Sequence, residues 1–422
     1  MMTEAANAAS DYDWRRIKVL KNPDYKQAME LMLSATLPVG TECVPLSQCG
    51  NRVLAQELIA RENVPAFDRS PYDGYAFRAA DTELASVGNP VVLRVLEEIP
   101  AGAVSTKKVV EQTASKVFTG SPIPDGADAV MMYERTEFTE HDVTLFSPVK
   151  PGENIVRTGE DVQKGAVLAG CGDLIDPGLA GVLAAQGNAV PCVYKIPRVA
   201  VFSTGSELVE AKILPEDGKI RNSNRYMLET ALKGIGCESV YFGIAGDSVA
   251  EISACLNKAL SACDAVVITG GVSAGDYDLT PDAMEASGVR ILLRGVDMKP
   301  GMACAYGVWN RKPICALSGN PASALTNFYV IAAPVLKKLA GCSRYLPREI
   351  SLVLPSGYQK KSPRTRFLRG RLRLENGAVC MDLPKDQGNA VLSSAIGCDV
   401  MAVIPAGSGP IGPGAVVKGF LL

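Results

Sequence analysis

Between about residues 195 and 342, short apolar segments alternate with segments of helical periodicity, and this alternation limits the fold more than any other feature. RVAVFST, ESVYFGI and DAVVIT have the length and composition of buried strands, whereas NSNRYMLETALKGIG and VAEISACLNKALSAC have the apolar faces of helices. Such an alternation predicts a doubly wound α/β domain built on a parallel sheet. Ligands of these sheets bind beyond the carboxyl ends of the strands, so the loops that follow the strands are the first place to look for a site.

The segments before and after the α/β segment have different sequence patterns. The 422 residues are enough for about three domains. Residues 24–35 place apolar side chains on one helical face, and the segment from 60 to 150 is rich in strand candidates and turn dipeptides. Glycine is dense from 150 to 190, where a helix is expected at LAGVLAAQG. After residue 343, the period-two alternation of FLRGRLRL predicts a small β-barrel or sandwich.

Charge and composition argue against several functional classes. The net charge of -2 leaves no basic footprint for nucleic acid. The single histidine, His141, lies in a polar run, which disfavours a zinc site or a histidine-based triad. The twelve cysteines form no C-x-x-C pair, which favours reduced thiols in a cytoplasmic protein. No signal peptide is recognisable and no stretch approaches ~20 apolar residues, so we expect no membrane span.

Three strands of the α/β segment end in glycine-containing loops, STGSEL, TGGVSAGDYD and LSGNPASA. Glycines allow backbone amides to approach a ligand closely, and Asn320-Pro321 begins a helix whose first turn favours an oxyanion. Taken alone, each loop is better explained by glycine serving a tight turn. Three such loops at one edge of a sheet favour a shared site.

Carboxylates follow the same strands: Glu207 after the first, Asp247 after the second, and Asp276 and Asp278 after the third. Helix capping or a solvated turn explains any one of them more simply. Carboxylates repel phosphate oxygens unless a cation intervenes, and Mg²⁺ accepts carboxylate, water and phosphate oxygens together. The combination predicts an anion held through a metal. Lys299 in VDMKPG is a candidate for further positive charge, with a plain surface lysine as the alternative.

Seven segments occur in the order SPYDGYA, TGSPIPDGADAV, GED, STGSEL, GGVSAGDYD, MKPG and LSGNPAS. Together they resemble the motifs of the molybdopterin molybdenumtransferase family, which includes the C-terminal domain of gephyrin, and the resemblance spans about residues 22 to 422. It implies an α/β and β multidomain fold with four domains. These are an elongated N-terminal domain formed by residues 22–60 and 149–194, an inserted β-rich domain of residues 61–148, a doubly wound α/β domain over 195–342 and a C-terminal β-barrel over 343–422.

The resemblance also implies an activity. Family members are homodimers whose active site lies between chains, formed by the α/β domain and barrel of one subunit and the N-terminal segments of the other. They take adenylylated molybdopterin and molybdate, use a divalent metal such as Mg²⁺, release AMP and leave molybdenum on the dithiolene. The partners implied are molybdopterin adenylyltransferase upstream and molybdoenzyme apoproteins or chaperones downstream, all in the cytoplasm.

Individual residues acquire expected roles from the same resemblance. Asp73 and Asp161 are expected to orient the substrate, or to help position the metal or the attacking oxyanion. Glu207, Asp247 and Asp278 are expected to organise Mg²⁺ near the phosphoanhydride, where the metal offsets charge as the bond to AMP breaks. The expected substrate-binding residues, which cradle phosphate or pterin groups or supply positive charge, are Thr119, Gly270, Gly271, Ser273, Lys299, Ser318, Gly319, Asn320, Ser323, Arg369 and Arg371.

The chain departs from the family pattern at two positions. Ser318 replaces the proline of L-P-G-N-P, which either loosens the loop by removing a φ restriction or adds a hydroxyl donor to the oxyanion pocket. Tyr72 replaces the methionine that usually precedes Asp-Gly-Tyr-Ala. Neither change removes a carboxylate, but both leave the choice between molybdate and tungstate open, because the two anions have nearly the same size and charge.

Three other functions stay open alongside molybdenum insertion. They are a scaffold or binding module that has lost catalysis, a paralogue that inserts tungstate, and the adenylylating step itself. Retention of the matched polar positions argues against the scaffold, and the domains that flank the α/β segment favour insertion over adenylylation. The sequence therefore favours an enzyme that inserts molybdenum into adenylylated molybdopterin.

Overall fold

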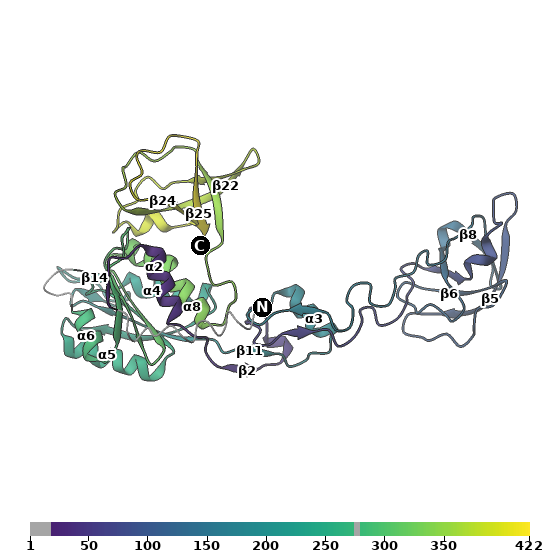
Figure 1. Ribbon diagram of the computed structural model, residues 1–422, viewed down its shortest axis with the longest axis horizontal. Helices are drawn as coiled ribbons and strands as arrows, with labels where there is room; N and C mark the ends of the chain where they lie inside the picture. Colours follow the sequence, from purple (N-terminus) through teal and green to yellow (C-terminus); the bar gives the residue numbers. More distant parts are fainter. Residues whose placement is uncertain (1–17, 274–278) are drawn as a thin grey trace. The chain divides into compact units, whose positions relative to one another are not determined.

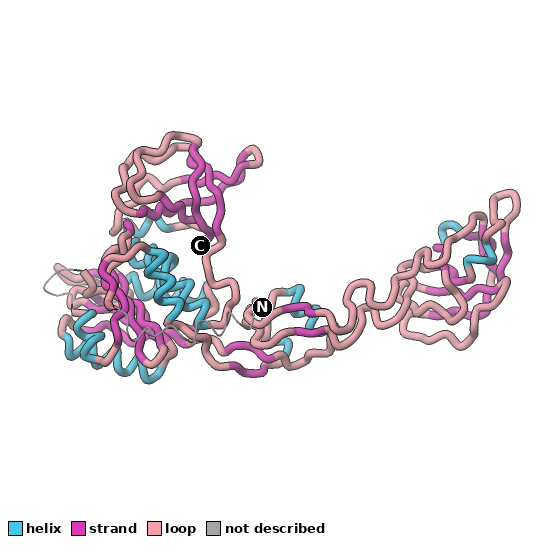
Figure 2. Tube along the Cα trace, in the orientation of Figure 1, coloured by secondary structure: helices cyan, strands magenta, loops and turns pink. Residues whose placement is uncertain are grey.

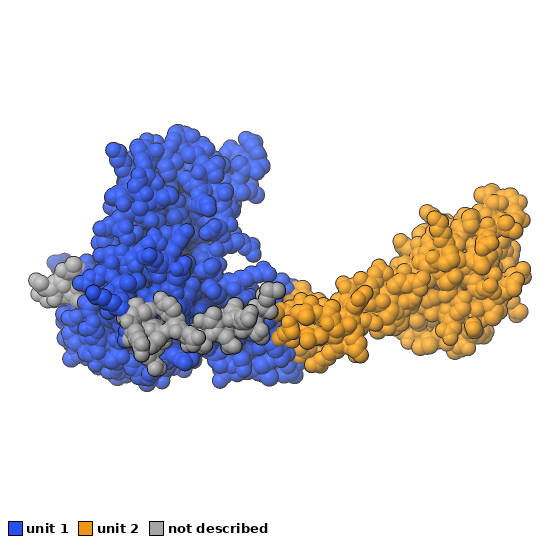
Figure 3. Space-filling model, in the orientation of Figure 1, with its two compact units in different colours: residues 1–56, 171–177, 190–422 blue, residues 57–170, 178–189 orange. Residues whose placement is uncertain are grey.

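The computed structural model describes residues 18–273 and 279–422. The chain divides into two compact units, which are coloured separately in Figure 3. Unit 1 consists of residues 1–56, 171–177 and 190–422, and unit 2 consists of residues 57–170 and 178–189. Each unit is described by itself below.

A seven-stranded mixed sheet forms the centre of unit 1 (Figure 1). In spatial order its strands are β1 (Leu20–Lys21), β17 (Arg290–Arg294), β19 (Cys304–Trp309), β20 (Lys312–Leu317), β16 (Ala265–Thr269), β12 (Arg198–Thr204) and β15 (Glu238–Ala245). Strands β20, β16, β12 and β15 are mutually parallel, which confirms the predicted doubly wound core. Their carboxyl ends therefore lie at one edge of the sheet.

The sheet differs from the expected parallel arrangement at β19, which runs antiparallel to both β17 and β20. The pairing of β19 with β20 comes from a two-residue turn at Asn310 and Arg311, both of which have positive φ values, of 46° and 68°. Such a turn joins neighbouring antiparallel strands and leaves no room for a crossover helix. The segment around CAYGVW therefore forms a hairpin with the strand that leads into LSGNP.

Helices cover both faces of this sheet (Figure 1). One face packs against α2 (Tyr25–Ser34), α4 (Ser223–Gly234) and the continuous run α7 (Pro321–Asn327), a π-helical turn (Phe328–Ala332) and α8 (Ala333–Leu339). The other packs against α5 (Val249–Ala262) and α6 (Thr280–Ala286). Along β12, Val199 and Val201 belong to the first core, whereas Ala200 and Phe202 belong to the second. Burial of each large side chain contributes about 1.5–3 kcal/mol.

The C-terminal part of unit 1 is a small closed barrel, as predicted for the segment after residue 343. Its sheet contains β18 (Met298–Lys299), β22 (Thr365–Glu375), β23 (Ala378–Asp382), β21 (Glu349–Leu354), β25 (Ala415–Leu421) and β24 (Val400–Ile404). Pairing of β22 with β24 closes the ring. Phe367 of the barrel packs edge-on against Tyr25 of α2, with ring centroids 5.1 Å apart, and both contribute to the first core of the α/β sheet.

Three two-stranded ribbons complete the strands outside the larger sheets. In unit 1, β2 (Thr41–Cys43) pairs with β11 (Cys192–Tyr194), and β13 (Leu208–Val209) pairs with β14 (Ile220–Arg221). In unit 2, β3 (Leu58–Ile59) pairs with β10 (Val167–Ala169). Helix α3 spans Pro177–Ala185, close to the helix predicted at LAGVLAAQG.

Unit 2 is built mainly of strands and loops, as Figure 2 shows. Its six-stranded sheet has the order β7 (Ala129–Met132), β4 (Gly74–Phe77), β6 (Thr113–Val117), β5 (Val91–Ile99), β9 (Asp142–Leu145) and β8 (Thr136–Phe138). Tyr75 and Phe77 lie on one side of β4 and are buried in its main core. The β-rich texture predicted for residues 60 to 150 is confirmed, whereas the exact four-domain division stays a prediction.

No helix within residues 18–273 and 279–422 combines the length and the apolar character that crossing a membrane requires.

Candidate functional site

The carboxyl ends of β12, β16 and β20 approach one another closely. Gly270 and Gly271 follow β16 with φ values of 102° and 61°. A Cβ on Gly270 would lie 2.6 Å from the Thr204 hydroxyl, and one on Gly271 would lie 2.6 Å from the Thr280 hydroxyl. Only glycine fits such contacts and such backbone angles. The two glycines thus allow the turn after β16 to sit directly against the end of β12.

We call Glu207 and Asp247 the acidic edge, because both carboxylates are exposed just beyond the ends of β12 and β15. The backbone N–H of Ser206 donates a hydrogen bond of 2.8 Å to Asp247, which joins the two loops. At Gly205, a Cβ would collide with the carboxylate of Glu207. The ammonium group of Lys219 donates to the carbonyl of Ser206 at 2.6 Å, so this edge also holds a cation.

The acidic edge has the donor chemistry that Mg²⁺ prefers, since both side chains offer carboxylate oxygens at the surface. The third expected ligand, Asp278, lies outside the described residues, as does Asp276. Among the residues that the structure describes, no group of three histidine, cysteine or acidic side chains is arranged to hold a metal. The trio of Glu207, Asp247 and Asp278 therefore stays a prediction.

A buried polar network fixes the ends of the strands beneath this edge. Asn222 and Thr269 each donate a hydrogen bond of 3.0 Å to the hydroxyl of Ser203. Asn222 also caps α4 by accepting a hydrogen bond from the backbone N–H of Arg225. All three network side chains are almost fully buried. Such a network, because its members are mutually satisfied, holds the loops in one arrangement.

Two polar atoms at this edge have no hydrogen-bond partner among the described residues, the hydroxyl of Thr204 and the amide oxygen of Asn224. The amide nitrogen of Asn224 donates to the carbonyl of Gly319 at 2.8 Å. Asn224 therefore ties the start of α4 to the SGNP loop. Neither residue was singled out from the sequence.

The SGNP loop follows β20. Ser318 is buried, and its hydroxyl accepts a hydrogen bond of 3.3 Å from the backbone N–H of Asn320. The hydroxyl thus closes a local turn at the position where the resemblance led us to expect a proline. Ser323 is buried in the first turn of α7, whereas Gly319, Asn320 and, in the preceding loop, Ser273 are exposed.

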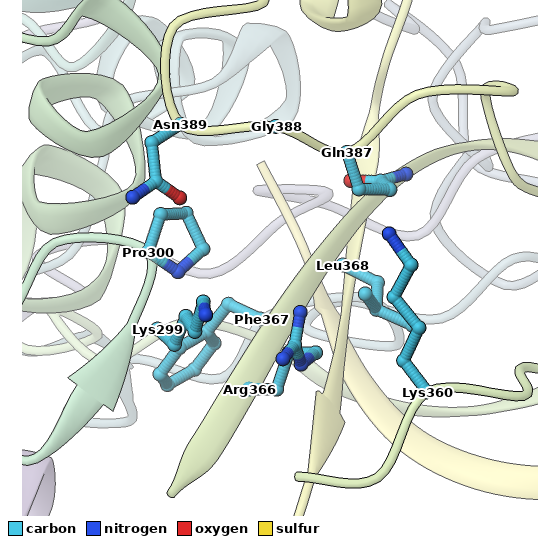
Figure 4. A pocket seen from close by; sticks show the side chains of 9 residues that line it. All are labelled: Lys299, Pro300, Lys360, Arg366, Phe367, Leu368, Gln387, Gly388 and Asn389. Carbon is cyan, nitrogen blue, oxygen red and sulfur yellow. The ribbon is translucent and has the colours of Figure 1, made fainter. Parts of the chain in front are cut away.

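A second feature of unit 1 is a pocket of about 270 Å³ lined by β18, β22 and two loops of the barrel (Figure 4). We call it the basic pocket, because Lys299, Lys360 and Arg366 line it. None of these three cations forms an ion pair with another described residue. The remaining lining residues are Pro300, Phe367, Leu368, Gln387, Gly388 and Asn389. Unpaired cations beside neutral amides form an environment suited to an oxyanion.

The basic pocket is joined to the glycine-loop edge through α7. Gly301 follows the pocket residue Pro300, and its carbonyl accepts a hydrogen bond of 2.6 Å from the side chain of Asn327 in α7. Helix α7 begins directly after the SGNP loop. A change in the basic pocket or in the SGNP loop therefore acts on α7, which contacts both.

The two arginines expected to attract anions are placed differently from the pocket cations. Arg369 is fully buried, and its guanidinium donates to the hydroxyls of Ser394 at 2.9 Å and of Thr326 in α7 at 3.5 Å. Burial lowers the pKa of Arg369, and its Nε–H has no partner among the described residues. Arg371 is exposed and donates to the carbonyl of Ile396.

Unit 2 carries the other expected site residues. Asp73 accepts hydrogen bonds from both the backbone N–H and the hydroxyl of Thr119, at 2.8 and 2.9 Å. Both bonds hold the pKa of Asp73 below its usual range, and the bond from the backbone N–H has the larger effect. Asp161 is exposed on a separate turn, where its backbone N–H donates to Val64. The structure thus brings Asp73 and Thr119 together.

Sequence reasoning missed several polar residues of these sites, namely Lys219, Asn224, Lys360, Arg366, Gln387 and Asn389. Arg366 and Leu368 lie two positions apart on one strand, so the period-two alternation assigns Arg366 to the apolar face. Lys360 and Asn389 lie in loops, where no periodicity marks them. The segment NSNR was the one signal that could have pointed to Asn224. It begins the helix that follows the STGSEL loop, so its asparagines are expected near the ends of the strands.

Comparisons with known proteins agree along most of the chain. Residues 24–187 match the MoeA N-terminal region (domain I and II), residues 200–338 a probable molybdopterin binding domain, and residues 351–422 the MoeA C-terminal region (domain IV). Molybdopterin molybdenumtransferases of Staphylococcus aureus and Bacillus subtilis are 35% and 36% identical. The first alignment covers 92% of this chain and 93% of the relative, and the second 90% of each.

A solved structure gives the same result. The molybdopterin biosynthesis moeA protein from Pyrococcus horikoshii matches with a TM-score of 0.82 and 32% sequence identity, covering 96% of this chain and 100% of that one. Sequence and structure therefore agree over nearly the full length of both proteins. The chain belongs to the MoeA family of molybdopterin molybdenumtransferases, transferase enzymes of molybdenum cofactor biosynthesis.

Proposed function

We propose that this enzyme transfers molybdenum from molybdate to adenylylated molybdopterin, releases AMP and depends on Mg²⁺. The observation that carries the proposal is the basic pocket, in which Lys299, Lys360 and Arg366 lack carboxylate partners among the described residues. Three cations without carboxylate partners leave a local excess of positive charge that attracts an anion. Molybdate is a compact dianion whose oxygens match ammonium, guanidinium and amide donors.

The acidic edge serves the other end of the substrate. Glu207 and Asp247 are the described residues that would hold Mg²⁺, with Asp278 as the further expected ligand. When bound, the metal supplies positive charge that offsets the phosphoanhydride oxygens. Gly319 is exposed in the loop after β20, where its backbone is open to a ligand at the ends of the parallel strands.

Asp73 and Thr119 are proposed to orient the substrate. The carboxylate of Asp73 is already ionised and held by Thr119, so it is ready to accept a hydrogen bond from an N–H or O–H of the substrate. Asp161 is proposed to act alongside it. At the acidic edge, the ammonium group of Lys219 is proposed to supply one more cation for the nucleotide end of the substrate.

The test is AMP release by the purified full chain supplied with adenylylated molybdopterin, Mg²⁺ and molybdate. We expect AMP and an active molybdenum cofactor only when all three are present, with the cofactor detected by activation of an apo-molybdoenzyme. Substrate binding without AMP release would contradict the proposal and favour a scaffold. A parallel reaction with tungstate in place of molybdate tests selectivity between the two anions.

Assembly and supply follow from the same proposal. We propose a cytoplasmic homodimer, which sedimentation at micromolar concentration tests, and a clear monomer would contradict it. The substrate is proposed to come from a molybdopterin adenylyltransferase, and the product to pass to molybdoenzyme apoproteins or their chaperones.

A further inference from the structure

The ribbon formed by β2 and β11 in unit 1 places two cysteines directly opposite each other. The register pairs Thr41 with Tyr194, and Cys43 with Cys192. Cys43 is exposed and Cys192 is partly exposed, and both are free thiols. The two residues lie far apart in the sequence, so only the folded ribbon brings them together.

The hydrogen bonds of the ribbon show which kind of cross-strand pair this is. The backbone N–H of Val44 donates to the carbonyl of Pro191 at 3.2 Å, and that of Lys195 donates to Gly40 at 2.9 Å. The first bond joins the pair next to Cys43–Cys192 and the second joins a pair three positions away, so the alternation of the ladder makes Cys43–Cys192 a non-hydrogen-bonded pair. In such pairs the Cα atoms lie about 4.5 Å apart and the side chains are closest. Disulfides form across Cα separations of about 4.4–6.8 Å.

The two thiols lie close to each other, because the cross-strand register places their residues directly opposite. A hydrogen bond to Cys192 is the largest of the effects that raise the pKa of Cys43. A third thiol, Cys171, lies nearby but has a different partner, because its sulfur is 3.3 Å from the hydroxyl of Tyr194. Burial, and then this contact, raise the pKa of Tyr194 to about 12. Cys171 is not in register with either cysteine of the pair.

We propose that Cys43 and Cys192 form a thiol–disulfide modification site that a low-molecular-weight disulfide, such as oxidised glutathione, converts reversibly to a cross-strand disulfide. One thiolate attacks a sulfur of oxidised glutathione, which forms a mixed disulfide and expels one glutathione thiolate. The second cysteine then attacks the mixed disulfide and expels the other. Two protein S–H bonds are lost, one S–S bond forms, and one oxidised glutathione becomes two reduced molecules that take up the two protons. Excess reduced glutathione reverses both steps.

The proposed bond would constrain a long stretch of chain. It would close a loop of about 150 residues, and the loss of freedom in the unfolded chain grows with loop length. We therefore expect oxidation to raise the unfolding midpoint of unit 1 by roughly 5–10 °C. This inference is independent of the proposed catalytic function and holds or fails without it.

The test is equilibration of the full chain with oxidised and reduced glutathione, followed by alkylation of free thiols and peptide mass spectrometry without reduction. We expect a cross-link that joins the peptides containing residues 43 and 192, with two fewer alkylated thiols and complete recovery after dithiothreitol. A mixed disulfide with glutathione that persists on Cys43, or no cross-link in a protein that is otherwise oxidised, would overturn the proposal.

Matched variants separate this pair from its neighbour. Cys43→Ser and Cys192→Ser are each expected to abolish the cross-link and the rise in unfolding midpoint, whereas Cys171→Ser is expected to retain both. Loss of the cross-link in the Cys171→Ser variant would assign the oxidisable pair differently and contradict the proposal. Dibromobimane, which becomes fluorescent on bridging two adjacent thiols, checks the reduced wild-type chain without any substitution and is expected to join the same two cysteines.

Discussion

The acidic edge and the basic pocket both belong to unit 1, and both are suited to negatively charged ligands, yet they carry opposite charges. At the edge, Glu207 and Asp247 are exposed carboxylates at the ends of parallel strands. In the pocket, Lys299, Lys360 and Arg366 converge without carboxylate partners among the described residues. Under the proposed function, the contrast means that the same enzyme would bind anions by two routes. An acidic surface requires a bridging cation, whereas a basic one binds the anion directly.

The two routes predict different responses to metal and to salt. Binding through a bridging metal should depend on the concentration of Mg²⁺. Direct binding to lysine and arginine should depend on ionic strength, because exposed charges are screened within about 10 Å at 0.1 M salt. The following substitutions break or sharpen this distinction, and they are ordered by expected effect.

Asp247→Asn should have the largest effect. The amide oxygen can still accept the hydrogen bond from Ser206, so the fold should be kept, but the charge that attracts Mg²⁺ is lost. We expect AMP release to fall about 100-fold, equivalent to about 2.7 kcal/mol of transition-state stabilisation, with little change in the KM for molybdate.

Asp217→Asn provides the matched control, because Asp217 is an exposed carboxylate in a neighbouring turn. Its turnover should equal that of the wild type. Wild-type turnover in the Asp247→Asn variant would remove the acidic edge from the mechanism.

Lys299→Met should have the next largest effect, and it should change the KM for molybdate rather than the dependence on Mg²⁺. Removing one of three pocket cations should raise the KM for molybdate about tenfold, or about 1.4 kcal/mol, and should leave the dependence on Mg²⁺ unchanged. Steady-state kinetics at two ionic strengths measure both quantities. The exposed Lys418 lies on β25, so Lys418→Met is the control for loss of a surface charge. An unchanged KM in Lys299→Met would show that the pocket does not bind molybdate.

Glu97 in unit 2 tests how a carboxylate behaves when protein donors alone satisfy it. Burial opposes its ionisation, but donors from Ser105, Thr106 and Lys107 outweigh this and lower the pKa of Glu97 to about 2. Because this value is below the ordinary one of 4.5, the stabilisation is complete above about pH 4.5 and is lost as the pH falls towards 2.

Glu97→Gln should therefore lower the stability of unit 2 at pH 7 by on the order of 1 kcal/mol, after allowance for screening by water. Thermal unfolding at a series of pH values measures the effect. The difference from the wild type should shrink steadily below pH 4.5, and a difference that is independent of pH would contradict the assignment.

Ser318→Ala should have the smallest effect of the series. It removes the hydroxyl that accepts from Asn320, which costs about 0.5–1 kcal/mol in stability, and turnover should change less than threefold. Denaturant unfolding and AMP release measure the two effects. A larger loss of turnover would show that the hydroxyl contacts the substrate directly.

Much of the fold could be predicted from the sequence, because apolar periodicity reports burial. The β-strands around VAVFST and AVVIT and the helices between them follow directly from it. The antiparallel hairpin of β19 and β20 could not, because Asn310 and Arg311 adopt positive φ angles that no apolar pattern reveals.

The candidate site was predictable where motif and strand end coincide, as at Gly270 and Asp247. The roles expected of Asp73 and Thr119 came from family resemblance alone, and their hydrogen bonds were not predicted, since 46 positions separate the two residues. Lys360 and Asn389 could not be predicted, because they come from loops that only the closed barrel brings to the pocket. Side-chain burial was equally invisible, and Arg369 has the sequence appearance of a surface cation although it is fully buried.

Helix α2 has a consequence for how this chain is made. Its residues Ala28 and Met32 are fully buried, and Tyr25 packs against Phe367, more than 300 positions later in the sequence. At about 5–20 residues per second, the ribosome takes roughly 20 to 70 s to deliver that partner. During synthesis the apolar face of α2 is therefore complete before its partner in the barrel exists, and the contact between Tyr25 and Phe367 can form only when the last fifth of the chain has emerged.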